Sequence, residues 1–279
     1  MRIFVTGATG FIGSNFLNYA LSEGHDIVAL KRSKDSRTRI KLNVEPFWLV
    51  KELDQVVKED LKDVDVVLHL AAHSMSPPYD TLENCLYWNL IAPVKLFKQA
   101  ILAGIKSFVV AGSCFEYGKS GEDYDFIPIT APLRPTLTYA ASKAASYLAF
   151  YQLAVENGVK LHYHRIFQVF GEGELETRLW PSLKKAALAG QDFPMTKGEQ
   201  IRDFIEVRKV AEKLLESAEL IIDREDFEPL INNLGSGKPQ SILEFSKFWW
   251  EKWGAKGKLL IGEIPYREGE VMRYVPKLN

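Results

Sequence analysis

Three side chains of this sequence have the types and the spacing needed to move a proton to or from an oxygen atom. Tyr139 and Lys143 lie four residues apart in the segment YAASK, and Ser113 ends the apolar segment SFVVAGS. Residues four apart share one face of a helix, so the lysine can stabilise a phenolate and lower a tyrosine pKa that is ordinarily about 10. The pattern predicts acid–base chemistry at a substrate oxygen, which the Ser113 hydroxyl would share.

A glycine-rich segment near the N-terminus, VTGATGFIG, predicts a dinucleotide site. Gly7, Gly10 and Gly13 follow an apolar run typical of a strand and come directly before a helical pattern. Glycines at this spacing allow a tight turn, a close approach of the backbone to a pyrophosphate, and close packing of helix on strand. The first N–H groups of the helix, at the positive end of its dipole, would face the phosphates.

Basic residues at the end of the second predicted strand favour NADP over NAD. A site for NAD usually has Asp or Glu at this point, where the carboxylate accepts a hydrogen bond from the ribose 2′-hydroxyl. This sequence has Lys31 and Arg32 instead, and a guanidinium can bind a 2′-phosphate through two hydrogen bonds. The alternative is a solvated basic loop, because the chain continues as SKDSRTRIK with further lysines and arginines.

Short apolar runs alternate with helical patterns in the first part of the chain, and this alternation indicates an α/β fold. Strands are predicted at 2–7, 26–30, 47–50, 64–72, 107–113 and 160–167, and helices at 14–23, 54–63, 84–103 and 139–157. Nearly continuous apolar strands joined by helices predict a doubly wound parallel sheet that is covered on both faces, with ligands at its carboxyl edge.

The second part of the chain has a different pattern, with short elements between Gly and Pro residues. Helical patterns are predicted at 182–190, at 207–219 and around Trp249, Trp250 and Trp253. The tryptophans fit a packed core or a subunit contact better than a ligand site. We therefore expect a dinucleotide-binding domain over 1–167 and a small C-terminal substrate-binding lobe over 168–279, with some segments of the lobe returning to the sheet.

Composition and charge exclude several classes of protein. The 279 residues are 47% hydrophobic and 25% charged, with a net charge of −1, so overall charge does not suggest binding to nucleic acid or to a membrane surface. Two cysteines, Cys85 and Cys114, are too few for a disulfide framework. With a strand at the N-terminus in place of a signal peptide and no apolar run of membrane-spanning length, we expect a cytoplasmic protein.

No metal site is expected. His69 and His73 are four residues apart but straddle the end of a strand, where they cannot share a helical face. His162 and His164 share one face of a predicted strand, and packing or the lining of a cavity is their simpler role.

Several segments together resemble the extended branch of the short-chain dehydrogenase/reductase superfamily, whose members are mostly nucleotide-sugar epimerases, dehydratases and reductases. They are TGATGFIG, HLAA, SCFEYG and YAASK, followed by RIFQVFGEGE, RDFIEVRKVA, NLGSGKPQSI and PYREGEV. The segments cover nearly the whole chain in the order of the family. The resemblance implies a Rossmann-type sheet, an NAD(P) cofactor, and a homodimer formed through the helices at 84–103 and 139–157.

The positions that match the motifs of the branch imply roles for individual residues. The catalytic residues would be Ser113, Tyr139 and Lys143. The cofactor-binding residues would be Gly7, Thr9, Gly10, Phe11, Ile12, Gly13, Lys31, Arg32, Leu70, Ala71, Ala72, Lys143 and Ile166. The substrate-binding residues would be Ser74, Cys114, Phe115, Gln168, Arg202 and Arg267. The two arginines would bind a pyrophosphate, with surface ion pairs as the alternative, and Asn89 would lie near the active site.

Departures from the pattern of the branch distinguish among its reactions. Sugar 4,6-dehydratases carry Thr-Asp-Glu where this sequence has Ser113-Cys114-Phe115, and Glu116 comes one position too late to replace the missing acid–base pair. We therefore expect NADPH to reduce the C4 ketone of a nucleotide-linked 4-keto-6-deoxyhexose, with Tyr139 as the proton donor. The alternative is an NAD-dependent nucleotide-sugar epimerase that retains its cofactor. A third hypothesis is a non-catalytic NADP-binding regulator.

Overall fold

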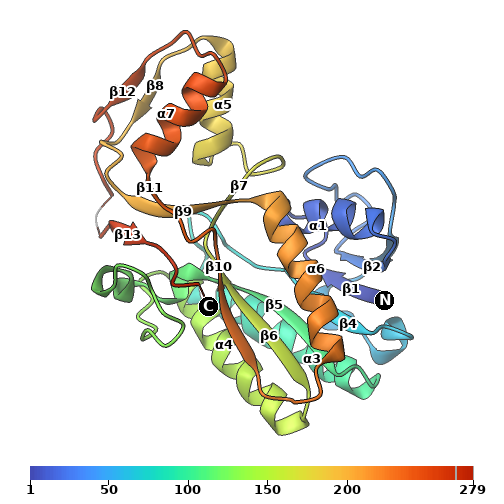
Figure 1. The fold of residues 1–279 in the computed structure, drawn as a ribbon. Helices are drawn as coiled ribbons and strands as arrows, with labels where there is room; N and C mark the ends of the chain where they lie inside the picture. Colours follow the sequence, from blue (N-terminus) through green and yellow to red (C-terminus); the bar gives the residue numbers. More distant parts are fainter. Residues whose placement is uncertain (268, 279) are drawn as a thin grey trace.

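The computed structural model describes residues 1–267 and 269–278, and its centre is a parallel sheet of seven strands (Figure 1). The strands are β1 Arg2–Thr6, β2 Asp26–Lys31, β3 Phe47–Val50, β4 Val66–His69, β5 Ser107–Ser113, β6 Lys160–Ile166 and β10 Leu230–Leu234. Their order is β10-β6-β5-β4-β1-β2-β3. The predicted doubly wound α/β sheet is confirmed. The order reverses next to β1, so a crevice for ligands is expected between the carboxyl ends of β1 and β4.

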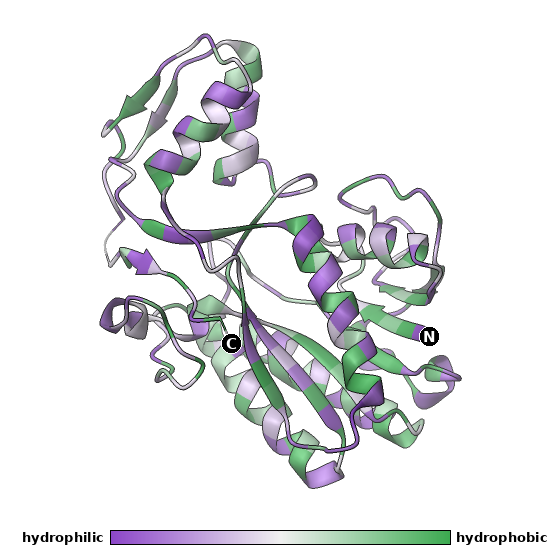
Figure 2. Ribbon diagram, viewed as in Figure 1, coloured by the Kyte–Doolittle hydropathy of each residue, from purple (hydrophilic) through white to green (hydrophobic). Residues whose placement is uncertain are grey.

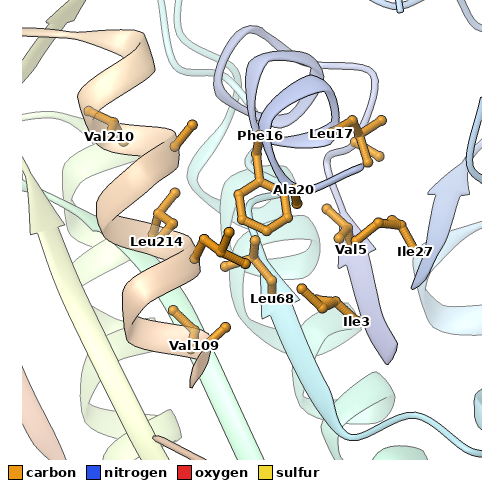
Figure 3. Packing of buried hydrophobic residues seen from close by; sticks show 14 of the residues in the cluster. Ile3, Val5, Phe16, Leu17, Ala20, Ile27, Leu68, Val109, Val210 and Leu214 are labelled. Atoms are coloured by element: carbon orange, nitrogen blue, oxygen red, sulfur yellow. The ribbon is translucent and has the colours of Figure 1, made fainter. Parts of the chain in front are cut away.

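Helices cover both faces of the sheet. They are α1 Phe11–Ser22, α3 Ala92–Leu102, α4 Thr138–Asn157 and α6 Val207–Asp223. On one face Ile3 and Val5 pack with Phe16 of α1 and Leu214 of α6 (Figure 3). On the other face Phe4 packs with apolar residues of α3 and α4. Successive residues of a strand point to opposite faces, so an apolar strand serves both layers. Figure 2 colours α6 in purple and green, as expected for a helix with one apolar face.

The predicted helix over 54–63 is wrong. The structure has two short 3₁₀ turns there, Leu53–Gln55 and Lys58–Leu61. Val56 and Val57, which separate the turns, have extended backbone conformations, as β-branched residues favour. Burial of Val56 in the core beneath α3 stabilises the extended link, and a helix is excluded.

The predicted helix over 84–103 is present but interrupted. A π turn at Tyr87–Ile91 separates α2 (Leu82–Leu86) from α3. Such wide turns often occur at functional sites. This one carries Asn89, whose side chain is buried and hydrogen-bonded.

The remaining elements form a smaller lobe, drawn at the upper left of Figure 1. They are β7 Gln168–Phe170, α5 Leu179–Ala189, β8 Phe193–Met195, β9 Ile201–Glu206, β11 Pro239–Ser241, α7 Ile242–Lys252, β12 Leu259–Ile261 and β13 Arg273–Tyr274. Strand β9 pairs with β7, β11 and β13, and β8 pairs with β12. Trp180, Trp249 and Trp253 pack with ring centroids 5.2–5.7 Å apart. The tryptophans therefore form a core, one of the two predicted roles.

Two elements of the second part of the chain contact the sheet. Strand β10 pairs with β6 at the edge of the sheet. Helix α6 packs beside α1 on the face of the sheet that contains Ile3 and Val5. The division into domains at 1–167 and 168–279 stays a prediction. His162 and His164 line a cavity of about 280 Å³ beside α6, as the cavity interpretation predicted. Over the described ranges, no helix is both long enough and apolar enough to cross a bilayer.

Candidate active site

The carboxyl ends of β1 and β4 bring the glycine-rich turn against the chain that follows His69. Gly7 has a φ of +66°, and a Cβ at this position would lie 2.6 Å from the backbone nitrogen of Ala71. A Cβ on Gly13 would lie 2.1 Å from the carbonyl oxygen of Gly7, so glycine is required at both positions. Helix α1 begins directly at this turn, and its first turn contains no acidic residue that would repel a phosphate.

A cavity of about 750 Å³ lies beside the turn, at the ends of β1, β2 and β4. Its lining includes nine of the residues predicted to bind cofactor or substrate. They are Gly7, Thr9, Gly10, Lys31, Arg32, Leu70, Ala71, Ala72 and Ser74. Phe11, Ile12 and Gly13 form the adjoining first turn of α1, and Ile166 pairs with Ser113 at the ends of β5 and β6. The cavity has the size and the exposed backbone that fit a dinucleotide such as NAD(P).

One wall of this cavity is basic and extends beyond the predicted residues. The basic wall consists of Lys31, Arg32, Arg37 and Arg39. The backbone nitrogen of Arg39 donates to the Thr9 carbonyl at 3.2 Å, which ties the loop to the glycine-rich turn. Sequence interpretation missed Arg37 and Arg39, because nothing in the run SKDSRTRIK distinguishes side chains that face a cavity from solvated ones.

Ser113, Tyr139 and Lys143 meet at the carboxyl end of β5. All three are buried, and Ser113 hydrogen-bonds with Tyr139. The Lys143 ammonium donates to the Ala111 carbonyl at 2.7 Å. Tyr139 and Lys143 come from one face of α4, so the helical spacing and the strand end together assemble the predicted group.

Burial dominates the ionisation of this group. It raises the pKa of the Tyr139 phenol above its ordinary value, against the lowering effect of the hydrogen bond with Ser113. It also lowers the pKa of Lys143 to about 8, although the Glu116 carboxylate acts in the opposite direction. Burial therefore outweighs the lowering effects on the pKa of Tyr139, and the expectation that Lys143 lowers this pKa stays a prediction. At neutral pH the phenol keeps its proton and can donate it.

Asn89 connects the cavity wall to the helix that carries Tyr139. Its side chain accepts from the His73 nitrogen at 2.7 Å and donates to the Ser142 hydroxyl at 2.9 Å. The Ser142 hydroxyl in turn donates to the Tyr139 carbonyl at 2.8 Å. Asn89 therefore lies near the predicted catalytic group and fixes the loop after β4 relative to α4.

The loop over 73–81 is stabilised by internal hydrogen bonds, and two of the residues that make them, His73 and Ser74, line the cavity. Ser74, predicted to bind substrate, has a φ of +63°, and its hydroxyl accepts from the Asp80 nitrogen at 2.8 Å. His73 Nε2 lies 2.7 Å from a carboxylate oxygen of Asp80. The loop also carries Tyr79, which lies near enough to Tyr139 that a phenolate at residue 79 would raise the pKa of Tyr139. Sequence interpretation missed Tyr79, which belongs to no motif and to no periodic pattern.

Residues 114 and 115 present no carboxylate to this region. Burial raises the pKa of the Cys114 thiol to about 12, so the thiol stays protonated at neutral pH. The Phe115 ring packs edge-on to the Tyr274 ring, with centroids 5.9 Å apart. Gln168, also predicted to bind substrate, begins β7 and is half-buried. The acid–base pair of a dehydratase is therefore absent from this strand end.

The two arginines predicted to bind a pyrophosphate differ in their surroundings. The Arg202 side chain is 12% exposed and donates to a Glu270 carboxylate oxygen and to the Val271 carbonyl, both at 2.8 Å. Arg202 thus makes an ion pair, as in the alternative interpretation, but in a largely buried position. Arg267 lies exposed at the surface.

Sequence interpretation missed a third arginine, Arg178. It is the N-cap residue of α5, and its charge lowers the pKa of the Cys114 thiol, as the charge of Arg202 also does. Its Nε lies 3.7 Å from Glu174, whose pKa is raised to about 7 by burial. Arg178 belongs to none of the motifs that the sequence presents.

His69 lies beneath the cavity as a packing residue. Its Nδ1 is 2.8 Å from the Thr6 hydroxyl, its ring packs edge-on to Phe97 and Phe150, and burial lowers its pKa to about 3. Among the residues that the structure describes, no three His, Cys, Asp or Glu side chains are grouped as metal ligands.

Comparison with known proteins adds to this geometry. The family model described as "NAD dependent epimerase/dehydratase family" matches residues 3–227. A UDP-glucose 4-epimerase of Corynebacterium glutamicum is 27% identical over 268 residues, which cover 88% of this chain and 78% of the epimerase.

Two further matches cover more of the compared protein. A dTDP-6-deoxy-L-talose 4-dehydrogenase (NAD(+)) of Aggregatibacter actinomycetemcomitans is 27% identical over 248 residues, which cover 87% of each protein. The solved structure of MoeE5 in complex with UDP-glucose and NAD superimposes with a TM-score of 0.84 at 26% identity. That match covers 100% of this chain and 90% of MoeE5.

Proposed function

This chain belongs to the NAD-dependent epimerase/dehydratase family, and on that premise we propose that it is an NADPH-dependent reductase of the C4 ketone of a nucleotide-linked 4-keto-6-deoxyhexose. At a coarser level it is an NAD(P)-dependent enzyme of the short-chain dehydrogenase/reductase type that modifies nucleotide sugars. The choice of NADPH over NAD rests on one observation, the basic wall of the cavity.

The basic wall supports NADPH as the cofactor because NADPH carries a charged phosphate on its adenine ribose, whereas NADH has a neutral hydroxyl there. The 2′-phosphate of NADPH is an anion that guanidinium groups bind with paired hydrogen bonds. Within the described lining of the cavity there is no Asp or Glu, the residue that an NAD site uses to accept from a free 2′-hydroxyl. The Gly7 turn and the N-terminus of α1 would hold the pyrophosphate. When bound, NADPH supplies the hydride.

The protein side of the proposed reaction belongs to Tyr139, Ser113 and Lys143. Tyr139, protonated at neutral pH, donates its proton to the oxygen of C4 as that oxygen becomes an alkoxide. Ser113 donates a hydrogen bond to the same oxygen, so both groups act most strongly where negative charge develops. Lys143, anchored on the Ala111 carbonyl, provides the positive charge that balances loss of the proton from Tyr139.

The proposal of ketone reduction in place of water elimination rests on Cys114 and Phe115. Elimination needs an acid and a base beside the sugar, and neither a thiol with a pKa of about 12 nor a phenyl ring supplies one. The 4-keto sugar would then come from a separate elimination reaction, which forms the ketone and the 6-deoxy group before this enzyme acts.

A nucleotide-sugar 4-epimerase that retains NAD is the second candidate, and the comparisons favour it. UDP-glucose 4-epimerases recur among the relatives, and MoeE5 is named with UDP-glucose and NAD. An epimerase would use the same three residues, remove a hydride from C4 and return it to the opposite face. No net oxidation would follow.

Absorbance of the reduced nicotinamide distinguishes the candidates. The purified protein would be mixed with NADPH and a panel of nucleotide-linked 4-keto-6-deoxyhexoses, and in parallel with UDP-glucose alone. We expect NADPH to be consumed with at least one keto sugar. Interconversion of UDP-glucose and UDP-galactose without added cofactor would instead establish the epimerase.

The Tyr139→Phe variant tests whether the protein is a catalyst at all. We expect its turnover to fall by about 10²-fold or more, because the proton donor is lost. A regulator that only binds NADP would show no turnover with any sugar, and its NADP-dependent binding of a partner would be unchanged by this substitution.

A further inference from the structure

Glu116 is a fully buried carboxylate that the proposed reaction does not use. Its exposure is 0%, and it forms an ion pair with Arg165, which is 2% exposed. Removing two charges from water is costly, and a buried pair persists only with good geometry and further hydrogen bonds. Because Glu116 lies only three residues after Ser113, we asked whether the buried pair acts on the catalytic group.

Every partner of the Glu116 carboxylate is a donor. One oxygen accepts from the Ser113 backbone nitrogen at 2.8 Å and from the Tyr163 hydroxyl at 2.7 Å, and the other accepts from Arg165 Nε at 2.9 Å. The pKa of Glu116 is raised on balance, because burial outweighs the lowering effects of these donors and of Lys143. With three donors on its two oxygens, the ionised carboxylate is the form that satisfies the whole set.

Glycine at position 112 makes this arrangement possible. A Cβ there would lie 2.3–2.6 Å from three atoms of the Tyr163 side chain, including its hydroxyl oxygen. Because Gly112 has no side chain, Tyr163 can lie across β5 and reach the carboxylate. Within the segment AGSCFE, Gly112 leaves space for the Tyr163 ring, and Glu116 accepts the hydrogen bond from the Tyr163 hydroxyl.

Arg165 is itself fixed on its remaining sides. One of its terminal nitrogens donates to the Tyr117 hydroxyl at 3.1 Å and to the Ile129 carbonyl at 3.0 Å. The guanidinium carbon lies 4.9 Å from the centroid of the Tyr117 ring and 4.4 Å from that of Tyr147. Such stacking and paired donation suit Arg better than Lys. The Arg165–Glu116 pair is therefore held rigidly beneath the end of β5.

The catalytic group is tied directly to this pair at Ser113. Glu116 caps the backbone of Ser113, and Lys143 is anchored two residues earlier on the same strand, at the Ala111 carbonyl. We propose that Glu116 is a positioning residue, which fixes the backbone of Ser113 and keeps a negative charge beside the Lys143 ammonium. The role assigned to Ser113 and Lys143 here rests on the proposed function.

Several ionisable groups surround Glu116, and their effects have known signs. Arg165 and Lys143 favour its ionised form, and the hydroxyls of Tyr163 and Tyr117 lie in the same network. Its charge in turn raises the pKa values of Lys143, Tyr139 and Cys114. Removing the charge should therefore make Lys143 lose its proton at a lower pH.

Lysine labelled with ¹³C at its ε carbon allows Lys143 to be titrated by NMR without any substrate, with Lys143→Met to assign the signal. In the wild type we expect a midpoint near pH 8. In Glu116→Gln, which keeps the shape and removes the charge, we expect the midpoint to fall by about one pH unit. Glu116→Asp keeps the charge, so its midpoint should lie close to that of the wild type.

The matched control is Tyr117→Phe, which removes a hydroxyl from the same buried network and leaves the carboxylate in place. It should leave the Lys143 midpoint within about 0.3 units of the wild type, an order-of-magnitude bound for loss of a neutral partner. If Glu116→Gln does not fold with Arg165 unpaired, the double variant Glu116→Gln/Arg165→Met removes both charges and should show a smaller fall in the same direction, because loss of the Arg165 cation offsets part of the effect. An unchanged midpoint in a folded variant, or an equal fall in Tyr117→Phe, would overturn the proposal.

The titration and the enzyme assay can fail separately. A wild-type protein that consumes NADPH with no keto sugar would contradict the proposed function, but the midpoint of Lys143 would still decide the role of Glu116. Where the wild type is active, the alkaline limb of its kcat profile should move in Glu116→Gln by the same shift as the NMR midpoint.

Discussion

Gly7 and Ala71 approach so closely that the Ala71 nitrogen lies 2.6 Å from the point where a side chain of residue 7 would begin. The two residues follow neighbouring strands, β1 and β4, and both line the large cavity. The geometry of the phosphate turn is thus set by a contact across the sheet as well as by the glycine spacing. A side chain at residue 7 would displace the wall against which the cofactor is proposed to bind.

We predict that Gly7→Ala weakens NADPH binding by about tenfold or more, because this shift costs on the order of the 1–3 kcal/mol typical of overpacking. The measurement is a titration of NADPH fluorescence with purified protein. Gly24→Ala is the matched control: Gly24 also has a positive φ, of +82°, but a Cβ there meets nothing within 4 Å. The control should lose about 1 kcal/mol of stability and keep its affinity. Equal affinities of the two variants would contradict the prediction.

The basic wall gives a second prediction. Arg32→Ala/Arg37→Ala should raise the Kd for NADPH by about tenfold or more and leave the Kd for NADH nearly unchanged, since a charge-assisted hydrogen bond contributes about 1.5–3 kcal/mol. Isothermal titration with both cofactors measures this directly. Lys34→Ala, an exposed residue of the same loop outside the cavity lining, should change neither value. A parallel loss for NADPH and NADH would show that these arginines do not read the 2′-phosphate.

Three buried histidines make stability sensitive to mild acid. Burial lowers the pKa of His69 to about 3, that of His162 to about 4, and that of His164 well below its ordinary value. An unfolded histidine takes up a proton near pH 6.5, so below that pH the unfolded state binds more protons and the free energy of unfolding falls.

We therefore expect urea unfolding to show lower stability at pH 5 than at pH 7. The slope should approach about 1.4 kcal/mol per pH unit for each histidine, because the folded forms stay neutral over this range. His162→Asn should lower the slope of the free energy of unfolding against pH by the contribution of one histidine, about 1.4 kcal/mol per pH unit. A free energy of unfolding that is flat from pH 7 to pH 5 would contradict the burial of these rings as neutral groups.

The predicted homodimer would form through α3 and α4. Apolar side chains on these helices lie exposed, with Leu102 at 68%, Leu148 at 62% and Val155 at 51%. We expect light scattering to give the mass of two chains, and Leu148→Glu to give that of one, because a charge would enter an apolar contact. Leu188→Glu, at an equally exposed position on α5, should leave the mass unchanged. A monomeric wild type would remove the prediction.

Sequence reasoning predicted the elements whose signals are local or periodic. Nearly continuous apolar strands indicated a parallel sheet, and Tyr139 and Lys143 were placed together by the helical repeat alone. Helix boundaries were less accurate: α1 begins at Phe11, three residues before the predicted start. The helix predicted over 54–63 failed because burial of Val56 favoured an extended link, an outcome decided by tertiary contacts that no local pattern contains.

The parts of the candidate site that sequence reasoning missed depend on long-range contacts. Tyr79 comes from a loop without a motif, and Arg178 is distant in sequence from Cys114, whose pKa its charge lowers. Lys143 was expected to lower the pKa of Tyr139. In the fold it is anchored to a strand carbonyl, and burial decides the ionisation of the phenol.

Packing of α6 against α1 has a consequence for how the chain is made. A ribosome releases Phe16 of α1 nearly two hundred residues before Leu214 of α6, the residue that lies beside it in the finished core. Until then the part of this face that α6 covers stays exposed, and the edge of the sheet beside β6 lacks β10. The sheet and its helical cover are completed only after α6 and β10 have emerged, so synthesis that pauses near residue 200 leaves an apolar surface for chaperones to shield.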